Sequence, residues 1–172
     1  DTPLNGNQQH YLEVLHRSGE TLLDLIHDIL DYSKIESGKM YLEKVEFEVK
    51  DLIDQCFKLF SATAGKREIE MISNVSPDTP NFLIGDPTRL RQIIVNLIGN
   101  ALKFTSDGFL YLKVEEIPFT EDIDPGQIAL RFSISDSGIG IARDDQPHLF
   151  DAFRQADSST TRKFGGTGLG LN

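Results

Sequence analysis

The sequence predicts an α+β protein in which one long helix precedes a two-layer α/β sandwich. Segments that alternate apolar and polar residues, typical of strands, are interspersed with amphipathic segments typical of helices, without the regular order of a parallel α/β fold. The first amphipathic segment, from Gln8 to about Lys34, is too long for a helix inside a compact domain. We therefore expect two domains in the 172 residues, a helical one over 1–42 and the sandwich over 43–172.

The long helix is predicted by apolar residues that recur with a helical period along the whole Gln8–Lys34 segment. At 1.5 Å per residue it would span roughly 40 Å, a length that suits a bundle or coiled coil, so we expect it to pack against a partner helix. Residues 1–7 are rich in turn formers and are expected to form a loop, and Ser37-Gly38 is expected to end the helix.

The sandwich is expected to begin at Val45, where VEFEV alternates apolar and polar residues as a strand does. Lys50–Ala64 has the apolar period of a helix, which Gly65 is expected to close. The remaining elements are expected in this order: a strand over Glu68–Val75, a turn over 76–80, a strand over Phe82–Ile84, a helix over Asp86–Thr105, strands over Phe109–Glu115 and Ile128–Ser135 joined by a loop at 118–126, and a helix near Gln146–Phe153.

The stretch Asp86–Thr105 carries the clearest helix signals in the chain. Asp86 suits the N-cap, and Pro87 suits the first helical position, where a missing N–H costs nothing. The apolar residues have the spacing of one buried stripe: Leu90, Ile93, Ile94, Leu97, Ile98, Ala101 and Leu102.

Three polar residues of this helix, Asn96, Asn100 and Lys103, are spaced so that they lie along one side of it. Amide oxygens can bind a metal ion and an ammonium group can bind phosphate, so the pattern suggests a site for Mg²⁺ and a polyphosphate. The alternative is that both asparagines only hydrogen-bond solvent at the edge of an ordinary amphipathic helix.

Two glycine clusters follow. Asp136-Ser137-Gly138-Ile139-Gly140 comes directly after a predicted strand, where glycines allow a ligand to approach the backbone and an aspartate can accept a hydrogen bond from an amine; a simple β-turn is the alternative. Gly165–Gly170 can present consecutive N–H groups to phosphates, and a flexible linker is the alternative. Neither cluster has the spacing of a Walker A loop or of a dinucleotide-binding GxGxxG.

The composition excludes several classes of protein. With 27 acidic and 17 basic residues the formal net charge is −10, which argues against broad binding to nucleic acid or anionic membranes. The single cysteine, Cys56, cannot form an internal disulfide and fits a reducing compartment. The sequence contains no apolar run long enough for a membrane-spanning helix and no signal-peptide pattern.

A family resemblance joins these motifs. The asparagine helix ending in NALKFT, then DSGIGI, then LFDAFRQADSSTTRKFGGTGLGL resembles the N, G1, F and G2 boxes of the histidine-kinase catalytic domain, in the same order. That domain belongs to the superfamily of gyrase-, Hsp90- and MutL-type ATPases. The segment LLDLIHDILDYSKIESGKMYLE resembles the second helix of the dimerisation and phosphotransfer domain. The sequence around the F box resembles that of hybrid sensor kinases.

The resemblance implies ATP and Mg²⁺ as ligands and a role for each matching residue. Asn100 would be the main Mg²⁺ ligand with Asn96 in support, and Lys103 would meet the phosphates. Asp136 would accept a hydrogen bond from the adenine amine. The glycines implied to shape the pocket are Gly138 and Gly140.

The resemblance also implies a lid over Asp157–Phe164, anchored at one end by Phe150 and Phe153, with Arg162 as a candidate phosphate clamp. Gln155 stands where many relatives carry an arginine, which puts that arginine's role in doubt here. The residues implied on the phosphate side are Gly166, Thr167, Gly168, Leu169 and Gly170.

The acceptor histidine of the family is expected to be absent. It lies on the first bundle helix in a motif like Ser-His-Glu-x-Arg-Thr-Pro-Leu, whereas residues 1–7 are interpreted as the loop that follows that helix. The histidines present, His10, His16, His27 and His148, are interpreted as solvated or packing residues. Because the family continues beyond the position of Asn172 into a helix and the last strands, we also expect an incomplete sandwich.

The function expected from the resemblance is the ATP-binding catalytic portion of a two-component sensor histidine kinase, the cytoplasmic part of a membrane-anchored bacterial sensor. It would phosphorylate a histidine on another bundle helix for relay to a receiver aspartate. The expected partners are a second histidine kinase, in a homodimer or heterodimer, and a response regulator, with no nucleic acid and no direct membrane contact. The alternative is a kinase-like regulatory module that pairs with another kinase without ATP turnover. A repair- or chaperone-type ATPase is disfavoured because Asn96 replaces the glutamate base of those relatives.

Overall fold

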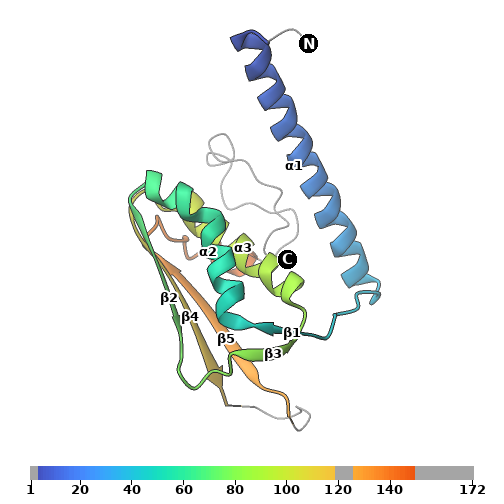
Figure 1. Cartoon of the computed structure of the whole chain (residues 1–172), viewed down its shortest axis with the longest axis vertical. Helices are drawn as coiled ribbons and strands as arrows, with labels where there is room; N and C mark the ends of the chain where they lie inside the picture. The colour runs from blue at the N-terminus through green and yellow to red at the C-terminus, as the bar shows by residue number, and fades with distance from the viewer. Residues whose placement is uncertain (1–3, 119–125, 150–172) are drawn as a thin grey trace. The chain divides into compact units, whose positions relative to one another are not determined.

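The computed structural model describes residues 4–118 and 126–149, which fall into two compact units. One unit contains the long helix α1 (Gly6–Glu36), and the other spans Leu42–Pro147 (Figure 1). Within the described ranges, no helix combines the length and the apolar character needed to cross a membrane.

A capping box starts α1. The side-chain oxygen of Asn5 accepts the Gln8 N–H at 2.9 Å, and the Gln8 side chain accepts the Asn5 N–H at 3.0 Å. This reciprocal cap begins the helix directly after Asn5. The prediction of a loop over 1–7 is therefore wrong for Gly6 and Asn7, which belong to the helix. The helix ends at Ser37, as predicted.

The second unit is built on a three-stranded mixed sheet. Its central strand is β4 (Gly108–Ile117), which is parallel to β2 (Ile69–Val75) and antiparallel to β5 (Ala129–Asp136). A separate antiparallel pair is formed by β1 (Val45–Glu48) and β3 (Phe82–Gly85).

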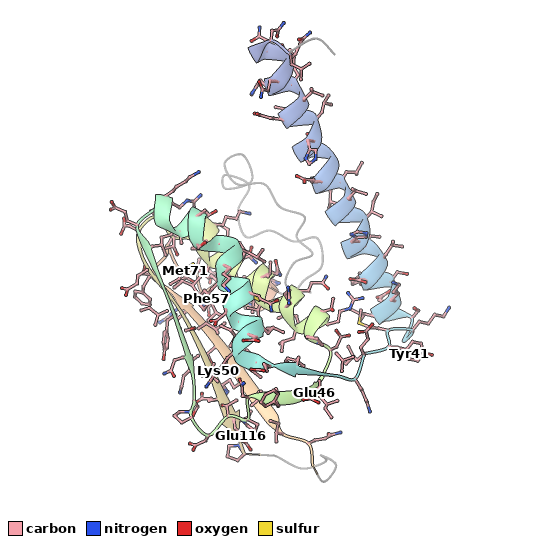
Figure 2. The ribbon with its side chains drawn as sticks, in the orientation of Figure 1. Tyr41, Glu46, Lys50, Phe57, Met71 and Glu116 are labelled. Atoms are coloured by element: carbon pink, nitrogen blue, oxygen red, sulfur yellow. The ribbon has the colours of Figure 1, made fainter. Side chains whose placement is uncertain are left out.

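Two helices, α2 (Val49–Lys66) and α3 (Pro87–Phe104), cover one face of the three-stranded sheet (Figure 1). Partly buried Phe57 of α2 and Met71 of β2 pack against the core (Figure 2). The most deeply buried large side chains come from both helices and from alternate positions of β4: Val49, Ile53, Ile94, Ile98, Leu110, Leu112 and Val114. The predicted α+β two-layer architecture is confirmed.

The end of α2 was not predicted correctly. Gly65 lies inside the last turn, and the helix continues to Lys66 with Arg67 as its C-cap. The chain reverses at Glu68, which has a φ of 56°, so a residue other than glycine adopts the left-handed conformation before β2.

Two further predictions need correction. Ile93 does not belong to the buried stripe of α3, because its side chain is 57% exposed, whereas Ile94 is buried. The helix predicted over Gln146–Phe153 is present in the described residues only as the short 3-10 helix Gln146–His148, whose central Pro147 has no N–H to donate. Residues 150–153 lie outside the described part of the chain.

Candidate nucleotide-binding site

Helix α3 supplies one side of the candidate site. Asn96, Asn100 and Lys103 lie one turn apart in succession, and all three are half-buried. The Lys103 ammonium lies 5.3 Å from the centre of the Phe104 ring. Two amides and a cation therefore line one side of a helix whose neighbouring stripe is buried in the core, a donor set that can bind a metal ion and phosphate oxygens.

Both ends of α3 are held by side chains. Asp86 at the N-cap accepts the Arg89 N–H at 3.0 Å, and its other oxygen accepts the Glu43 N–H at 3.2 Å. The hydrogen bond from Arg89 is the main reason that the pKa of Asp86 lies below its ordinary value. At the opposite end, Arg67 donates from Nη1 to the Leu102 carbonyl oxygen at 2.6 Å, which satisfies a carbonyl of the last turn.

The end of β5 supplies the other side of the site. Asp136 is the last residue of β5 and pairs with Leu110 in the antiparallel register. Residues directly opposite each other point to the same face of a sheet, and Leu110 is fully buried on the helix-covered face. Asp136 therefore points to the face covered by α3, at the exposed margin of the sheet.

The loop after β5 is fastened to the C-terminal end of α3. The Ile139 N–H donates to the Phe104 carbonyl oxygen at 3.3 Å, and the Gly138 N–H donates to Asp136 Oδ1 at 2.9 Å. Gly138 lies tightly against this end. A Cβ atom on it would lie 2.7 Å from Asp136 Oδ1, 2.7 Å from the Phe104 carbonyl oxygen and 2.9 Å from Thr105 Oγ1.

Ser137 fixes the same loop to the start of β4. Its N–H donates to the Phe109 carbonyl oxygen at 3.1 Å, and its Oγ accepts the Phe109 N–H at 2.9 Å. Gly108 allows this approach, because it has a φ of 106° and a Cβ there would collide with the Ser137 side chain. The loop that follows Asp136 is thus held from two directions, by the end of α3 and by the start of β4.

Gly140 has a different role from Gly138. Its φ is 70°, and a Cβ on it would meet nothing within 4 Å. The conformation of its backbone, not the space around it, favours glycine at this position.

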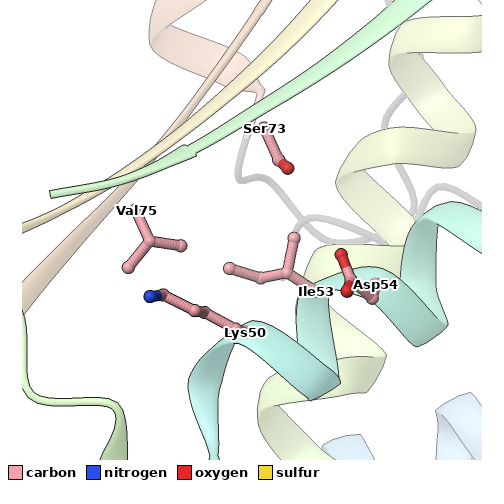
Figure 3. Close-up of a pocket in the computed structure, with 5 residues that line it drawn as sticks. All are labelled: Lys50, Ile53, Asp54, Ser73 and Val75. Carbon is pink, nitrogen blue, oxygen red and sulfur yellow. The ribbon is translucent and has the colours of Figure 1, made fainter. Parts of the chain in front are cut away.

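One hollow lies away from this site. It has a volume of about 220 Å³ and lies between α2 and β2, lined by Lys50, Ile53, Asp54, Ser73 and Val75 (Figure 3). It includes no residue of α3 or of the loop after β5, so it is not part of the candidate nucleotide site.

The comparison with protein families identifies the class of protein. The family "Histidine kinase-, DNA gyrase B-, and HSP90-like ATPase" matches residues 85–172, and "His Kinase A (phospho-acceptor) domain" matches residues 1–38. The chain belongs to the sensor histidine kinases within this ATPase family.

Individual relatives match along the whole chain. The signal transduction histidine-protein kinase BarA of Escherichia coli (strain K12) is 42% identical over 170 residues, which cover 99% of this chain and 18% of BarA. The sensor histidine kinase GacS of Pseudomonas protegens is 40% identical over 185 residues, covering 99% of this chain and 20% of GacS. The chain thus spans about a fifth of the length of these relatives. The crystal structure of full-length ShkA in complex with AMPPNP has a TM-score of 0.76 and 35% identity, covering 99% of this chain and 33% of that one.

The structure brings together part of the predicted site. Asn96, Asn100 and Lys103 lie on α3, and Asp136 is the last residue of β5. Gly138 and Gly140 lie on the loop after β5, which is bonded to the end of α3. The other predicted residues lie outside the described part of the chain: Phe150, Phe153, Arg162, Gly166, Thr167, Gly168, Leu169 and Gly170, with Gln155 and the lid over Asp157–Phe164.

Two residues of this region were not singled out from the sequence. Ser137 and Thr105 were present in the quoted motifs, but their sequence positions do not show that one ties the loop to β4 and that the other lies against Gly138. The only signal in the sequence was position: Ser137 directly follows Asp136, the predicted adenine ligand, and Thr105 lies at the end of the predicted helix.

Proposed function

We propose that this chain is the ATP-binding catalytic portion of a two-component sensor histidine kinase and that it transfers the γ-phosphoryl group of ATP to a histidine on another bundle helix. The observation that carries this proposal is the attachment of the Asp136 loop to the end of the asparagine helix, which brings an acceptor for an amine beside a donor set for phosphate and metal. The similarity to ShkA, whose structure is a complex with AMPPNP, supports ATP as the nucleotide.

The Asp136 carboxylate suits the adenine end of the nucleotide. Its Oδ1 already accepts the Gly138 N–H, which orients the group and leaves Oδ2 to accept a hydrogen bond from the 6-amino group. A carboxylate can only accept, so it favours adenine over a base with a carbonyl oxygen in that place.

The amides of α3 suit Mg²⁺. Asn100 and Asn96 present carbonyl oxygens from successive turns of a helix whose ends are both held, and Mg²⁺ takes few protein ligands when phosphate oxygens and water complete its shell. The bound ion would neutralise charge on the β- and γ-phosphates. Lys103, one turn further on, would hold a phosphate oxygen by a charge-assisted hydrogen bond.

In the transfer, an imidazole nitrogen of the acceptor histidine forms a bond to the γ-phosphorus, while the bond between that phosphorus and the bridging oxygen of ADP breaks. The site residues named here position and stabilise charge, which is the main requirement of phosphoryl transfer. We further propose that α1 contributes to a dimerisation bundle and that a response regulator receiver accepts the phosphoryl group.

Calorimetry of ATP binding to the full chain, with Mg²⁺ and with EDTA, tests the nucleotide site. We expect Asn100→Ala to weaken binding about tenfold or more with Mg²⁺ and much less with EDTA, and Asp136→Ala to weaken it in both conditions. Asn74→Ala, on the exposed side of β2, is the matched control and should bind as wild type. Unchanged affinity in Asp136→Ala would contradict the adenine contact. Transfer of label from ATP to an added polypeptide that carries an acceptor helix tests the kinase activity.

A further inference from the structure

The side chain of Thr105 is buried beside the proposed adenine site and has no hydrogen-bond partner among the residues that the structure describes. Thr105 is the C-cap of α3 and only 2% exposed. Its Oγ1 has no hydrogen-bond partner in the described part of the chain. Because an unpaired buried hydroxyl costs free energy, a partner that arrives with a ligand would stabilise the complex.

Gly138 places this hydroxyl relative to Asp136. Thr105 Oγ1 and Asp136 Oδ1 both lie within 3 Å of the point where a Cβ on Gly138 would be, at 2.9 and 2.7 Å. The hydroxyl therefore lies beside the carboxylate that is proposed to accept the adenine amine. The third oxygen at this point, the Phe104 carbonyl, already accepts the Ile139 N–H at 3.3 Å.

The chemistry of the three oxygens differs in one respect. The carboxylate and the carbonyl can only accept hydrogen bonds, whereas the Thr105 hydroxyl can also donate one. The 6-amino edge of adenine presents both a donor, the amine, and an acceptor, N1. Asp136 can satisfy only the donor, so the group that completes recognition of this edge must be able to donate.

We propose that the Thr105 hydroxyl is a specificity-determining group for adenine that acts beside Asp136 on the 6-amino edge of the base, directly or through one bound water. This inference rests on the proposed function. If the hydroxyl only fills space at the end of α3, replacing it by a methyl group will not change the choice between bases.

The test compares four forms of the full chain: wild type, Thr105→Val, Thr105→Ser and Thr79→Val. Valine keeps the shape of threonine and removes the hydroxyl, while serine keeps the hydroxyl. Thr79 is the matched control, because it is also buried (7% exposed) with an unpaired Oγ1 among the described residues, but lies in the turn after β2. Calorimetry with Mg²⁺ measures the affinities for ATP and for inosine triphosphate, which has an oxygen in place of the 6-amino group.

We expect Thr105→Val to bind ATP about three- to tenfold more weakly, the range of one net hydrogen bond, and to bind inosine triphosphate with little change. The ratio of the affinity for ATP to the affinity for inosine triphosphate should therefore be smaller in Thr105→Val than in the wild type. Thr105→Ser and Thr79→Val should keep the wild-type preference. The midpoint of thermal unfolding without nucleotide should not fall in Thr105→Val, because removing an unpaired buried hydroxyl relieves a penalty.

Three results would overturn the proposal. Wild-type ATP affinity in Thr105→Val would show that the hydroxyl does not contribute, and equal loss for both nucleotides would show that it does not discriminate between the two bases. Absence of ATP binding by the wild type would refute the proposed function itself, and this inference with it. If Thr105→Val does not fold, Thr105→Ala and Thr105→Ser decide: a narrowed preference in the alanine variant alone supports the proposal, and any other pattern rejects it.

Discussion

At the scale of single residues, the loop after β5 depends on the absence of a side chain at position 138. Three oxygen atoms lie less than 3 Å from the position that a Cβ would take there, and two of them belong to the end of α3. One is a backbone oxygen that cannot move without shifting the helix end. The glycine is therefore required by close approach, because the loop carries Asp136 directly against α3.

We predict that Gly138→Ala will weaken ATP binding by at least about tenfold and lower the midpoint of thermal unfolding. The physical reason is that the methyl group must push the loop away from Phe104 and Thr105, which displaces Asp136. Calorimetry and thermal unfolding of the same samples measure both effects. Gly65→Ala is the control: it lies in the last turn of α2 with nothing within 4 Å, and should stabilise by about 0.5–1 kcal/mol. Normal ATP affinity in Gly138→Ala would mean that the loop can move without affecting the site.

At the scale of elements, α3 is a helix fixed at both ends. Asp86 holds the first turn and also the Glu43 N–H of the segment before β1, while Arg67 reaches from the end of α2 to the last turn. Asn96 and Asn100 lie between these two points, and Lys103 directly follows Leu102. A fixed helix keeps their spacing relative to the loop that carries Asp136, which is what a site built from two separate elements needs.

The Asp86 cap gives a prediction about pH. The hydrogen bond from Arg89, and then that from Glu43, hold the pKa of this carboxyl below its ordinary value of 3.8. A lowered folded-state pKa stabilises the fold above the unfolded-state value, and this stabilisation is lost as the pH falls through the folded-state value. We expect Asp86→Asn, which keeps a capping oxygen without the charge, to unfold at a lower temperature than wild type at pH 7. The difference should shrink below pH 3.8, and thermal unfolding from pH 7 to pH 3 measures it. A difference independent of pH would contradict the role of the charge.

The sequence predicted the boundaries of some elements better than those of others. The bounds of α3 were predicted correctly because Asp86, Pro87 and the apolar period are local signals. The end of α2 was not, because Glu68 adopts a left-handed conformation as the chain turns into β2. For the site, spacing alone indicated the asparagines of α3, but the contact between the loop after β5 and the end of α3 joins residues more than thirty positions apart and could be inferred only from the family resemblance. A buried hydroxyl such as that of Thr105, without a partner among the described residues, leaves no pattern in a sequence.

At the scale of the whole molecule, the surface of α1 is unusual for an isolated helix. Its apolar residues include Leu22, Ile26 and Ile29, which are spaced on one side of the helix and are 58%, 44% and 50% exposed. A long helix with this much exposed apolar surface gains stability by packing against another helix.

We predict that the chain associates through α1 and that Leu22→Glu combined with Ile29→Glu shifts it toward the monomer. Charged residues in the middle of the apolar stripe would have to be buried without a partner in the associated state. Sedimentation velocity over a range of concentrations measures the shift. Ile84→Glu is the control, because Ile84 is 75% exposed on β3 and lies outside α1. Equal loss of association in the control would show that the interface is not on α1.

The last prediction is that this chain does not phosphorylate its own histidines, although its proposed function is that of a histidine kinase. His10, His16 and His27 are exposed on α1, and none of them is followed by the acidic residue and Arg-Thr-Pro-Leu sequence that the family's acceptor carries. His16 pairs with Glu20, at 3.3 Å between Nδ1 and Oε1, which is an exposed pair one turn apart and not an acceptor motif.

Incubation of the full chain with labelled ATP, followed by acid treatment, should reveal no acid-labile label on it. Adding a polypeptide with an acceptor helix should produce such label there, and Asn100→Ala should abolish it. Acid-labile label on the chain itself, lost in one of the single variants His10→Gln, His16→Gln, His27→Gln or His148→Gln, would identify an acceptor and show that the interpretation of these histidines is wrong.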